Sequence, residues 1–307
     1  MNQNLKIGII IVAALVLISF VITILITSQA LDLSPNSQLT SKAALIKISG
    51  EITTEPSASL FAAPALSSSE IAKLIDDANK NKGIDAVLFE INSPGGTVVA
   101  SEEIANAIKK VEKPTVSYIK EVGASGGYWV ASATDWIVAD KYSTTGSIGV
   151  IGSYLSFAGL LDRYNITYER LVGGKYKDVG SPYRDLTPEE MKLLQGKIDL
   201  IHNAFIEEVA QNRNLSYDYV ANLATGMFYL GQEAYELGLV DELGNEETAK
   251  TYLKDVLGAD EIKLVEYKKE PSLLEAFSQI LSQASFFVGQ GISFGFVEAG
   301  NKNPFKV

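Results

Sequence analysis

EVGASGGY, residues 121–128, lies between a strand-like run at 115–120 and a helical run of small residues at 128–133. A strand–turn–helix corner of this kind displays one hydroxyl, that of Ser125, with almost no side-chain bulk around it. Glycines on both sides permit a tight backbone and the close approach of a substrate chain. The corner fits the pattern G-x-S-x-G and predicts that Ser125 is a nucleophile.

Strands and helices alternate on both sides of this corner, which predicts an α/β fold. Residues 43–49 suit a first strand, and the near-continuous apolar run 85–91 predicts a central strand covered on both faces. A helix is expected from about 98 to 111 and a further strand at 135–140. Residues 187–190 have the cap, proline and acidic first turn of a long helix. Its apolar residues recur at three-four spacing and are expected to face the core: Met191, Leu194, Ile198, Ile201 and Phe205.

A nucleophilic serine needs a base, and the composition limits the choice. The chain has no cysteine and one histidine, His202, which falls within the long amphipathic helix, where a structural histidine is expected. Lysine is the other base that serves a serine, provided that its amine is desolvated. Lys175 and Lys177 are the candidates. If their segment is extended, both point to the same side, so strand alternation does not separate them.

The segment Asn92-Ser93-Pro94-Gly95-Gly96 follows the predicted central strand and precedes a helix. Free N–H groups at such a position bind a negatively charged oxygen. Phosphate binding is the weaker interpretation, because neither G-x-G-x-x-G nor G-K-[ST] is present and no basic side chain lies nearby. A nucleic-acid partner is not expected either, since the net charge is −11 and the basic residues do not cluster.

Residues 7–26 form an uninterrupted apolar run without charge, about the 20 residues that a membrane-spanning helix needs. The distribution of basic residues predicts a cytoplasmic N-terminus with everything after residue 30 outside. A cleaved signal peptide is the alternative, but the run exceeds the roughly 7–15 apolar residues of a signal sequence. The polar residues 28–42 read as a linker.

Four motifs occur in register along the chain: Asn92–Gly96, Ala124–Tyr128, Thr145–Val150 and Gly174–Pro182. In this order they closely resemble the signal peptide peptidase A family of membrane-bound serine proteases, in its short, single-domain form. The resemblance runs from about Ala43 to Leu257. It implies a Clp protease/crotonase-like α/β domain, which the apolar run at 7–26 places behind an N-terminal transmembrane helix.

The resemblance also implies the roles of individual residues. Ser125 would be the nucleophile and Lys177 the base of a Ser-Lys dyad, with Ser147 as an accessory serine that hydrogen-bonds the lysine. The oxyanion hole would fall on Gly96, with Gly95 adjacent and Gly126 assisting. Lys175 is an extra cation, which would favour the neutral amine of Lys177 if it faced the site and would do nothing if it faced solvent. No metal or cofactor is implied.

The expected organisation is a cytoplasmic stub and anchor at 1–27, a linker at 28–42, a protease domain at 43–260 and a C-terminal tail at 261–307. The tail could dock on a neighbour, lie on the membrane or pack on its own domain. The resemblance implies a homo-oligomer whose neighbouring subunits complete one another's sites. It also implies that the protein degrades released signal peptides and other extended apolar peptides. Two alternatives are an inactive membrane-tethered scaffold of the same fold and a crotonase-type acyl-CoA enzyme.

Overall fold

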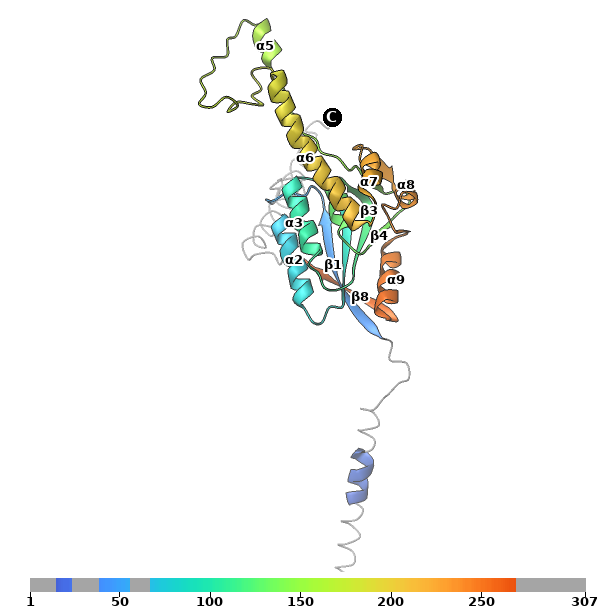
Figure 1. Cartoon of the computed structure of the whole chain (residues 1–307). Coiled ribbons are helices and arrows are strands. Elements are labelled where there is room, and N and C mark those ends of the chain that lie inside the picture. Colours follow the sequence, from blue (N-terminus) through green and yellow to red (C-terminus); the bar gives the residue numbers. More distant parts are fainter. Residues whose placement is uncertain (1–14, 24–38, 56–66, 269–307) are drawn as a thin grey trace, which may run out of the picture.

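A mostly parallel β-sheet runs through the centre of the computed structural model, which describes residues 15–23, 39–55 and 67–268 (Figure 1). Its strands are β1 Thr40–Ser49, β2 Ala86–Ser93, β3 Thr115–Ala124, β4 Trp136–Ala139, β5 Thr144–Gly146, β6 Phe228–Leu230, β7 Glu242–Leu243 and β8 Glu261–Tyr267. The main order across the sheet is β6-β5-β3-β2-β1-β8, and β4 joins β3 to β7. Each pairing is parallel except that of β5 with β6.

Helices lie on both faces of this sheet (Figure 1). They are α2 Ser68–Lys80, α3 Val98–Ile108, α4 Gly126–Ser132, α5 Ala158–Arg163, α6 Pro188–Asn212, α7 Tyr217–Leu223, α8 Gly231–Glu236 and α9 Glu246–Leu257. The predicted α/β class is therefore confirmed, and the predicted central strand is β2, which is buried along nearly its whole length.

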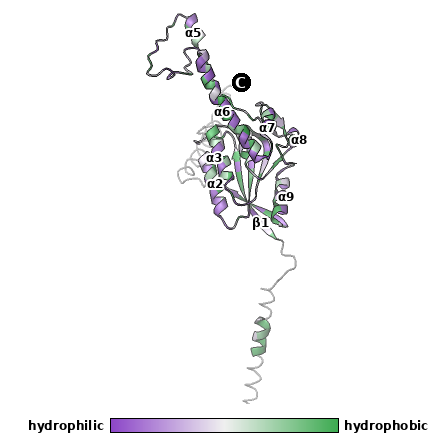
Figure 2. Ribbon diagram, in the orientation of Figure 1, coloured by the Kyte–Doolittle hydropathy of each residue, from purple (hydrophilic) through white to green (hydrophobic). Residues whose placement is uncertain are grey.

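Two hydrophobic cores form because the strands send alternate side chains to opposite faces. In β1, Ala44, Ile46 and Ile48 face the larger core, which α2, α3, α4 and α6 cover. Ala43 and Leu45 face the smaller core beneath α9. Hydrophobic residues accordingly concentrate on the strands at the centre of the molecule, while the helices are mixed (Figure 2).

The sheet continues beyond the predicted end of the protease domain at residue 260. β8 pairs in parallel with β1, with Thr40 opposite Glu261 and Ile46 opposite Tyr267. The first seven residues of the predicted tail thus belong to the sheet, whereas residues 269–307 lie outside the described residues.

The long helix α6 begins where its sequence predicts. Thr187 and Glu190 form a reciprocal capping box, and Pro188 is the first helical residue. The core-facing stripe holds only for the second half of the helix, where Phe205 is 1% exposed. Met191, by contrast, is 59% exposed, because the first half of α6 extends beyond the body together with α5 and its flanking loops (Figure 1). We call this projecting part, residues 153–194, the arm.

The predicted anchor falls mostly outside the described residues. Residues 15–23 are helical and apolar (Figure 2). Among the described residues, no helix is both long and apolar enough to span a bilayer. The transmembrane segment therefore stays a prediction.

Candidate active site

Three predicted site segments meet at one edge of the sheet because each follows the carboxyl end of a parallel strand. Gly95 and Gly96 follow β2, Ser125 follows β3, and Ser147 follows β5. The register places Ser93 beside Gly123 and Ala124 beside Gly146. Ser125 and Ser147 are thus the next residues of two adjacent strands.

The Ser125 backbone has φ 52° and ψ −123°, a conformation that residues with a side chain rarely adopt. Its N–H donates to the Gly146 carbonyl at 2.8 Å, and its own carbonyl accepts from the N–H of Trp129 at 2.9 Å. These bonds fix the corner from both sides. The Ser125 hydroxyl makes no hydrogen bond within the described residues and does not cap α4, so it is available for chemistry.

The glycines at 95 and 96 are required by close backbone approach. A Cβ on Gly95 would lie 2.6 Å from the Gly126 nitrogen and 2.9 Å from the Ser125 Cβ. On Gly96 it would lie 1.9 Å from the carbonyl oxygen of Ile52. Gly96 and Ile52 pair in an isolated parallel bridge. The loop after β2 is therefore pressed directly against the Ser125 corner.

The N–H groups of Gly96 and Gly126 at this contact have no acceptor among the described residues. Gly126 is the first residue of α4, so its N–H has no partner within the helix. The N–H of Gly96 donates to no acceptor in the described part of the chain, since its bridge uses the N–H groups of Ile52 and Thr97. The Gly96 nitrogen lies 3.2 Å from the position that a Cβ on Gly126 would take. The two donors thus lie side by side, as an oxyanion hole needs.

Ser125 lies between two cavities. The first has a volume of about 320 Å³, and its walls include the apolar side chains Val98, Trp129, Ile151 and Phe205. The second, of about 400 Å³, is lined by Ser147 and by one face of α6, which contributes Gln195, Ile198, Asp199 and His202. A peptide chain that crosses Ser125 would place groups in both.

Ser147 shares the backbone geometry of Ser125, with φ 51°. Its N–H donates to the Met227 carbonyl at 3.1 Å, and its hydroxyl donates to the Gly226 carbonyl at 3.0 Å. A hydroxyl that donates its only proton still has two lone pairs to accept with. Ser147 is thus prepared to accept a hydrogen bond in the second cavity.

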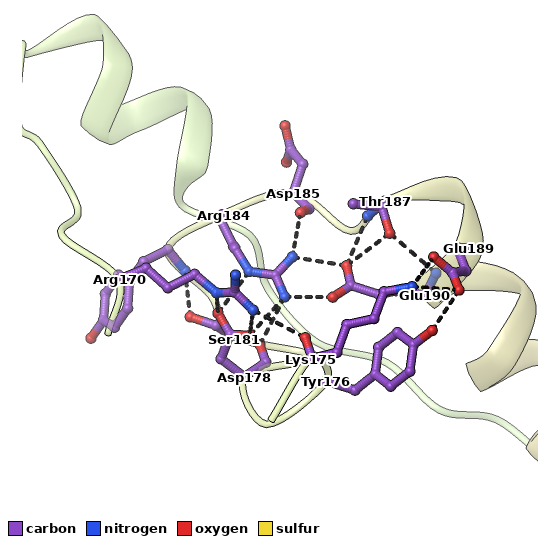
Figure 3. Close-up of polar contacts among 11 residues, drawn as sticks. Arg170, Lys175, Tyr176, Asp178, Ser181, Arg184, Asp185, Thr187, Glu189 and Glu190 are labelled. Carbon is purple, nitrogen blue, oxygen red and sulfur yellow. Dashed lines mark hydrogen bonds and ion pairs between the residues drawn. The ribbon is translucent and has the colours of Figure 1, made fainter. Parts of the chain in front are cut away.

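Lys177 lies on the arm and lines neither cavity. Residues 174–181 form successive turns rather than an extended segment, with N–H to carbonyl bonds from Lys177 to Gly174 and from Ser181 to Asp178. This loop contacts the first turn of α6 (Figure 3). The α6 wall of the cavity begins only at Gln195, about 10 Å further along the helix axis than Pro188 at 1.5 Å per residue. Within one chain, the structure does not bring Lys177 to Ser125.

The turns give Lys175 and Lys177 different surroundings, which strand alternation could not distinguish. The Lys175 ammonium pairs with both oxygens of Glu189, at 2.8 and 2.7 Å, and lies over the Tyr176 ring (Figure 3). Hydrogen bonding to Glu189 raises the pKa of Lys175. The Lys177 side-chain nitrogen makes no hydrogen bond or ion pair among the described residues. Lys175 therefore faces Glu189 rather than the site.

His202 is the residue whose position the sequence describes least well. It lies within α6, as the sequence predicts, but it also lines the second cavity with Ser125 and Ser147. Its Nε2 is buried and has no hydrogen-bond partner among the described residues. Gln195 and Asp199, hydrogen-bonded to each other at 2.7 Å, line the same wall. The sequence did not single them out, although their i, i+4 spacing predicts that they share one face of the helix.

Known proteins resemble this chain in sequence. The model of "Peptidase family S49" matches residues 107–260. The chain is 38% identical over 227 residues to "Putative protease MJ0651" of Methanocaldococcus jannaschii, covering 73% of this chain and 71% of that protein. It is 33% identical over 248 residues to "Putative signal peptide peptidase SppA" of Enterococcus faecium, covering 80% and 71%. A solved structure of a membrane-bound stomatin-specific protease with a substrate peptide matches with a TM-score of 0.47 and 15% identity, over 80% of this chain and 99% of that one. The resemblance that the four motifs predicted is confirmed, and the chain belongs to peptidase family S49.

Proposed function

We propose that this protein is a membrane-anchored serine endopeptidase that cuts extended apolar peptides, including released signal peptides, outside the cytoplasmic membrane. The observation that carries the proposal is the Ser125 hydroxyl at a strained corner beside the N–H groups of Gly96 and Gly126, none of which has a hydrogen-bond partner among the described residues. Membership of a peptidase family supports hydrolytic chemistry at this corner.

In the proposed mechanism, the neutral amine of Lys177 takes the proton of the Ser125 hydroxyl as the oxygen attacks a peptide carbonyl carbon. The carbonyl oxygen becomes an oxyanion and accepts hydrogen bonds from Gly96 and Gly126, each worth about 10²–10³ in rate. The lysine returns its proton to the leaving amine as the peptide bond breaks. Water then attacks the acyl-enzyme and loses a proton to the Lys177 amine. The lysine returns this proton to the Ser125 oxygen as the ester bond breaks, which releases the acid and restores the hydroxyl.

The lysine of this dyad comes from a second copy of the chain. Lys177 is exposed on the arm, while the cavity that holds Ser125 and Ser147 opens beside the middle of α6. Large apolar side chains are exposed along the arm, among them Leu155, Leu160, Ile166, Leu171, Met191 and Leu193. Exposed apolar surface of this extent is typical of an interaction site. A neighbouring arm lying across the body would cover that surface and bring its own Lys177 to Ser147.

The substrate class is supported by the first cavity. Its walls of Val98, Trp129, Ile151 and Phe205 suit an apolar side chain of the peptide next to the cut bond. The second cavity, which is more polar, would hold the lysine and the departing segment.

The test uses the full-length chain in detergent and a synthetic signal peptide whose products are identified by mass spectrometry. Ser125→Ala and Lys177→Ala are each expected to abolish cleavage with the fold retained. Lys175→Gln is the matched control, because it removes a lysine two residues away and should leave cleavage intact. Full activity of Lys177→Ala would exclude the dyad.

Covalent labelling by an active-site serine probe separates this function from that of an inactive scaffold. The probe is expected to modify wild-type chain at Ser125 and to leave Ser125→Ala unlabelled. Absence of labelling and of cleavage in wild-type chain would favour the scaffold. The anchor is tested separately, by alkaline extraction of membranes. The full-length chain is expected to stay in the membrane, and the chain without residues 1–27 is expected to be released.

A further inference from the structure

We propose that Arg184 is a positioning residue for the base: with Arg170, Asp178 and Glu190 it forms a clasp that fixes the loop carrying Lys177 and keeps the neighbouring carboxylate from pairing with the lysine. This inference rests on the proposed function, in which Lys177 acts on the Ser125 of a second copy. We refer to these four residues as the arginine clasp (Figure 3).

The clasp holds the residue directly after Lys177. Arg170 donates to both oxygens of Asp178, from Nε at 2.5 Å and Nη2 at 2.6 Å. Arg184 donates to the same two oxygens, from Nε at 2.8 Å and Nη2 at 3.0 Å. Both oxygens thus accept from two guanidinium groups, and the Asp178 side chain is only 11% exposed. Paired N–H bonds of this fork geometry fix direction as well as distance.

Arg184 also ties this loop to α6. Its Nη1 and Nη2 donate to the two oxygens of Glu190, at 2.8 and 2.7 Å. Glu190 is itself held by the N–H of Thr187 at 2.9 Å, as part of the box that caps the helix. Its side chain is 6% exposed although it lies on the arm. The backbone at Lys177 is therefore connected through Asp178 and Arg184 to the rigid start of a 25-residue helix.

The clasp also balances charge beside the base. A free carboxylate next to Lys177 would hold the lysine as an ammonium, which is useless for taking a proton. Two arginines occupy that carboxylate, and Glu189 is occupied by Lys175 and by the Tyr176 hydroxyl. Asp178 and Glu189 are thus engaged by other residues, while the Lys177 side-chain nitrogen has no partner in the described part of the chain.

The Lys175–Glu189 pair provides the matched comparison. It lies on the same loop and joins it to the same turn of α6, but its side chains are 66% and 57% exposed. Exposed pairs contribute little to stability or geometry. Replacing Glu189 by Gln should therefore not disturb Lys177, whereas replacing Arg184 should.

The experiment mixes inactive full-length variants, dissociated and reassembled in detergent, and measures cleavage of the synthetic peptide. The reference mixture is Ser125→Ala, which supplies Lys177, with Lys177→Ala, which supplies Ser125. Recovery of activity in this mixture establishes that copies share sites. No recovery would overturn the proposed shared dyad itself, independently of the clasp.

Arg184→Gln is then added to one copy at a time. On the Ser125→Ala copy it should lower the recovered rate by about 10²-fold, the cost of a misplaced catalytic group, through kcat rather than KM. On the Lys177→Ala copy it should leave the recovered rate unchanged, because the clasp of that copy carries no lysine. If the role were purely structural, Arg184→Gln would lower the recovered rate equally in both mixtures, and this result would overturn the inference.

Two further variants keep the result decisive. Asp178→Asn retains the size of the side chain but removes the charge, and it should reproduce the one-sided loss. Glu189→Gln on the lysine-supplying copy should leave the rate unchanged. Native mass spectrometry reports whether the variants join the assembly. Failure of Arg184→Gln and Asp178→Asn copies to assemble would show that the clasp serves assembly instead, and would also overturn the inference.

Discussion

Ser125 and Ser147 follow the paired residues Ala124 and Gly146 of two adjacent parallel strands, and both have a positive φ, of 52° and 51°. The N–H of Ser125 donates to the Gly146 carbonyl, so the two corners are directly hydrogen-bonded. Non-glycine residues at such angles cost of order 1–3 kcal/mol each and persist where the surrounding structure imposes them. Both serines lie on the wall of one cavity, so the strain is concentrated at the site.

The first prediction concerns this strain. Ser125→Gly is expected to be more stable than Ser125→Ala by about 1–3 kcal/mol, because only glycine adopts φ 52° and ψ −123° without cost. Both variants lack the hydroxyl, and Ser125 caps no helix N–H, so the comparison isolates the backbone. Denaturant unfolding measures the difference. The control pair is Asn106→Gly and Asn106→Ala in the exposed face of α3, where the order should reverse by about 0.5–1 kcal/mol.

The second prediction concerns the oxyanion hole. A Cβ on Gly126 would lie 2.2 Å from the Ser101 Oγ, so Gly126→Ala should displace the N–H that we propose as an oxyanion donor. We expect kcat to fall by about 10²–10³ with little change in KM. Adding Ser101→Gly removes the obstructing hydroxyl and should restore part of kcat. Unchanged kcat in Gly126→Ala would show that this N–H does not serve the transition state.

The third prediction concerns His202, which lines the cavity with Ser125 and whose buried Nε2 has no partner within the described part of the chain. Because the proposed base is a lysine, His202→Gln should retain cleavage and serine-probe labelling. Loss of both, with Lys177→Ala still active, would assign the base to the histidine. Measuring the two variants side by side on the same peptide decides between them.

The fourth prediction concerns acid. Hydrogen bonds from Arg184 lower the pKa of Glu190 to about 2, and Arg184 and Arg170 together hold the pKa of Asp178 well below its usual range. Groups with a lowered pKa stabilise the folded state above their unfolded values of about 4, and this contribution is lost as the pH falls further. Amide hydrogen exchange in residues 170–190, corrected for intrinsic rates, should therefore be slow at pH 5 and rise below about pH 4. Arg184→Gln should exchange rapidly at both values, and an equally steep change in that variant would contradict the assignment.

The parts of the site that the sequence predicts are those fixed by strand ends. Ser125, Ser147 and Gly96 each follow a strand, and parallel strands end at one edge, so local pattern is enough to gather them. The position of Lys177 depends instead on turns at 174–181 and on ion pairs between residues six to eight positions apart. Lysine spacing carries no information about such contacts, which is why Lys175 and Lys177 could not be separated by alternation.

The stripe on α6 failed for a related reason. Met191 and Phe205 are both apolar and both fit the three-four spacing of one helix face. This spacing indicates only that the face avoids water. It does not report which body covers that face. Phe205 packs on Trp129 with ring centroids 4.4 Å apart, whereas Met191 lies on the arm, beyond the single chain's own core.

The direction of β1 has a practical consequence. Thr40 begins the strand at one end of the sheet, and the Ser125 corner lies past the other end, so ten residues of strand, about 33 Å, separate the point of chain entry from the hydroxyl. A group attached before residue 40 is therefore joined to the end of the sheet opposite Ser125. An affinity tag or a solid support placed there leaves the Ser125 end of the sheet unobstructed. The proposed chemistry can then be studied on immobilised copies whose spacing on the support is set by the experimenter.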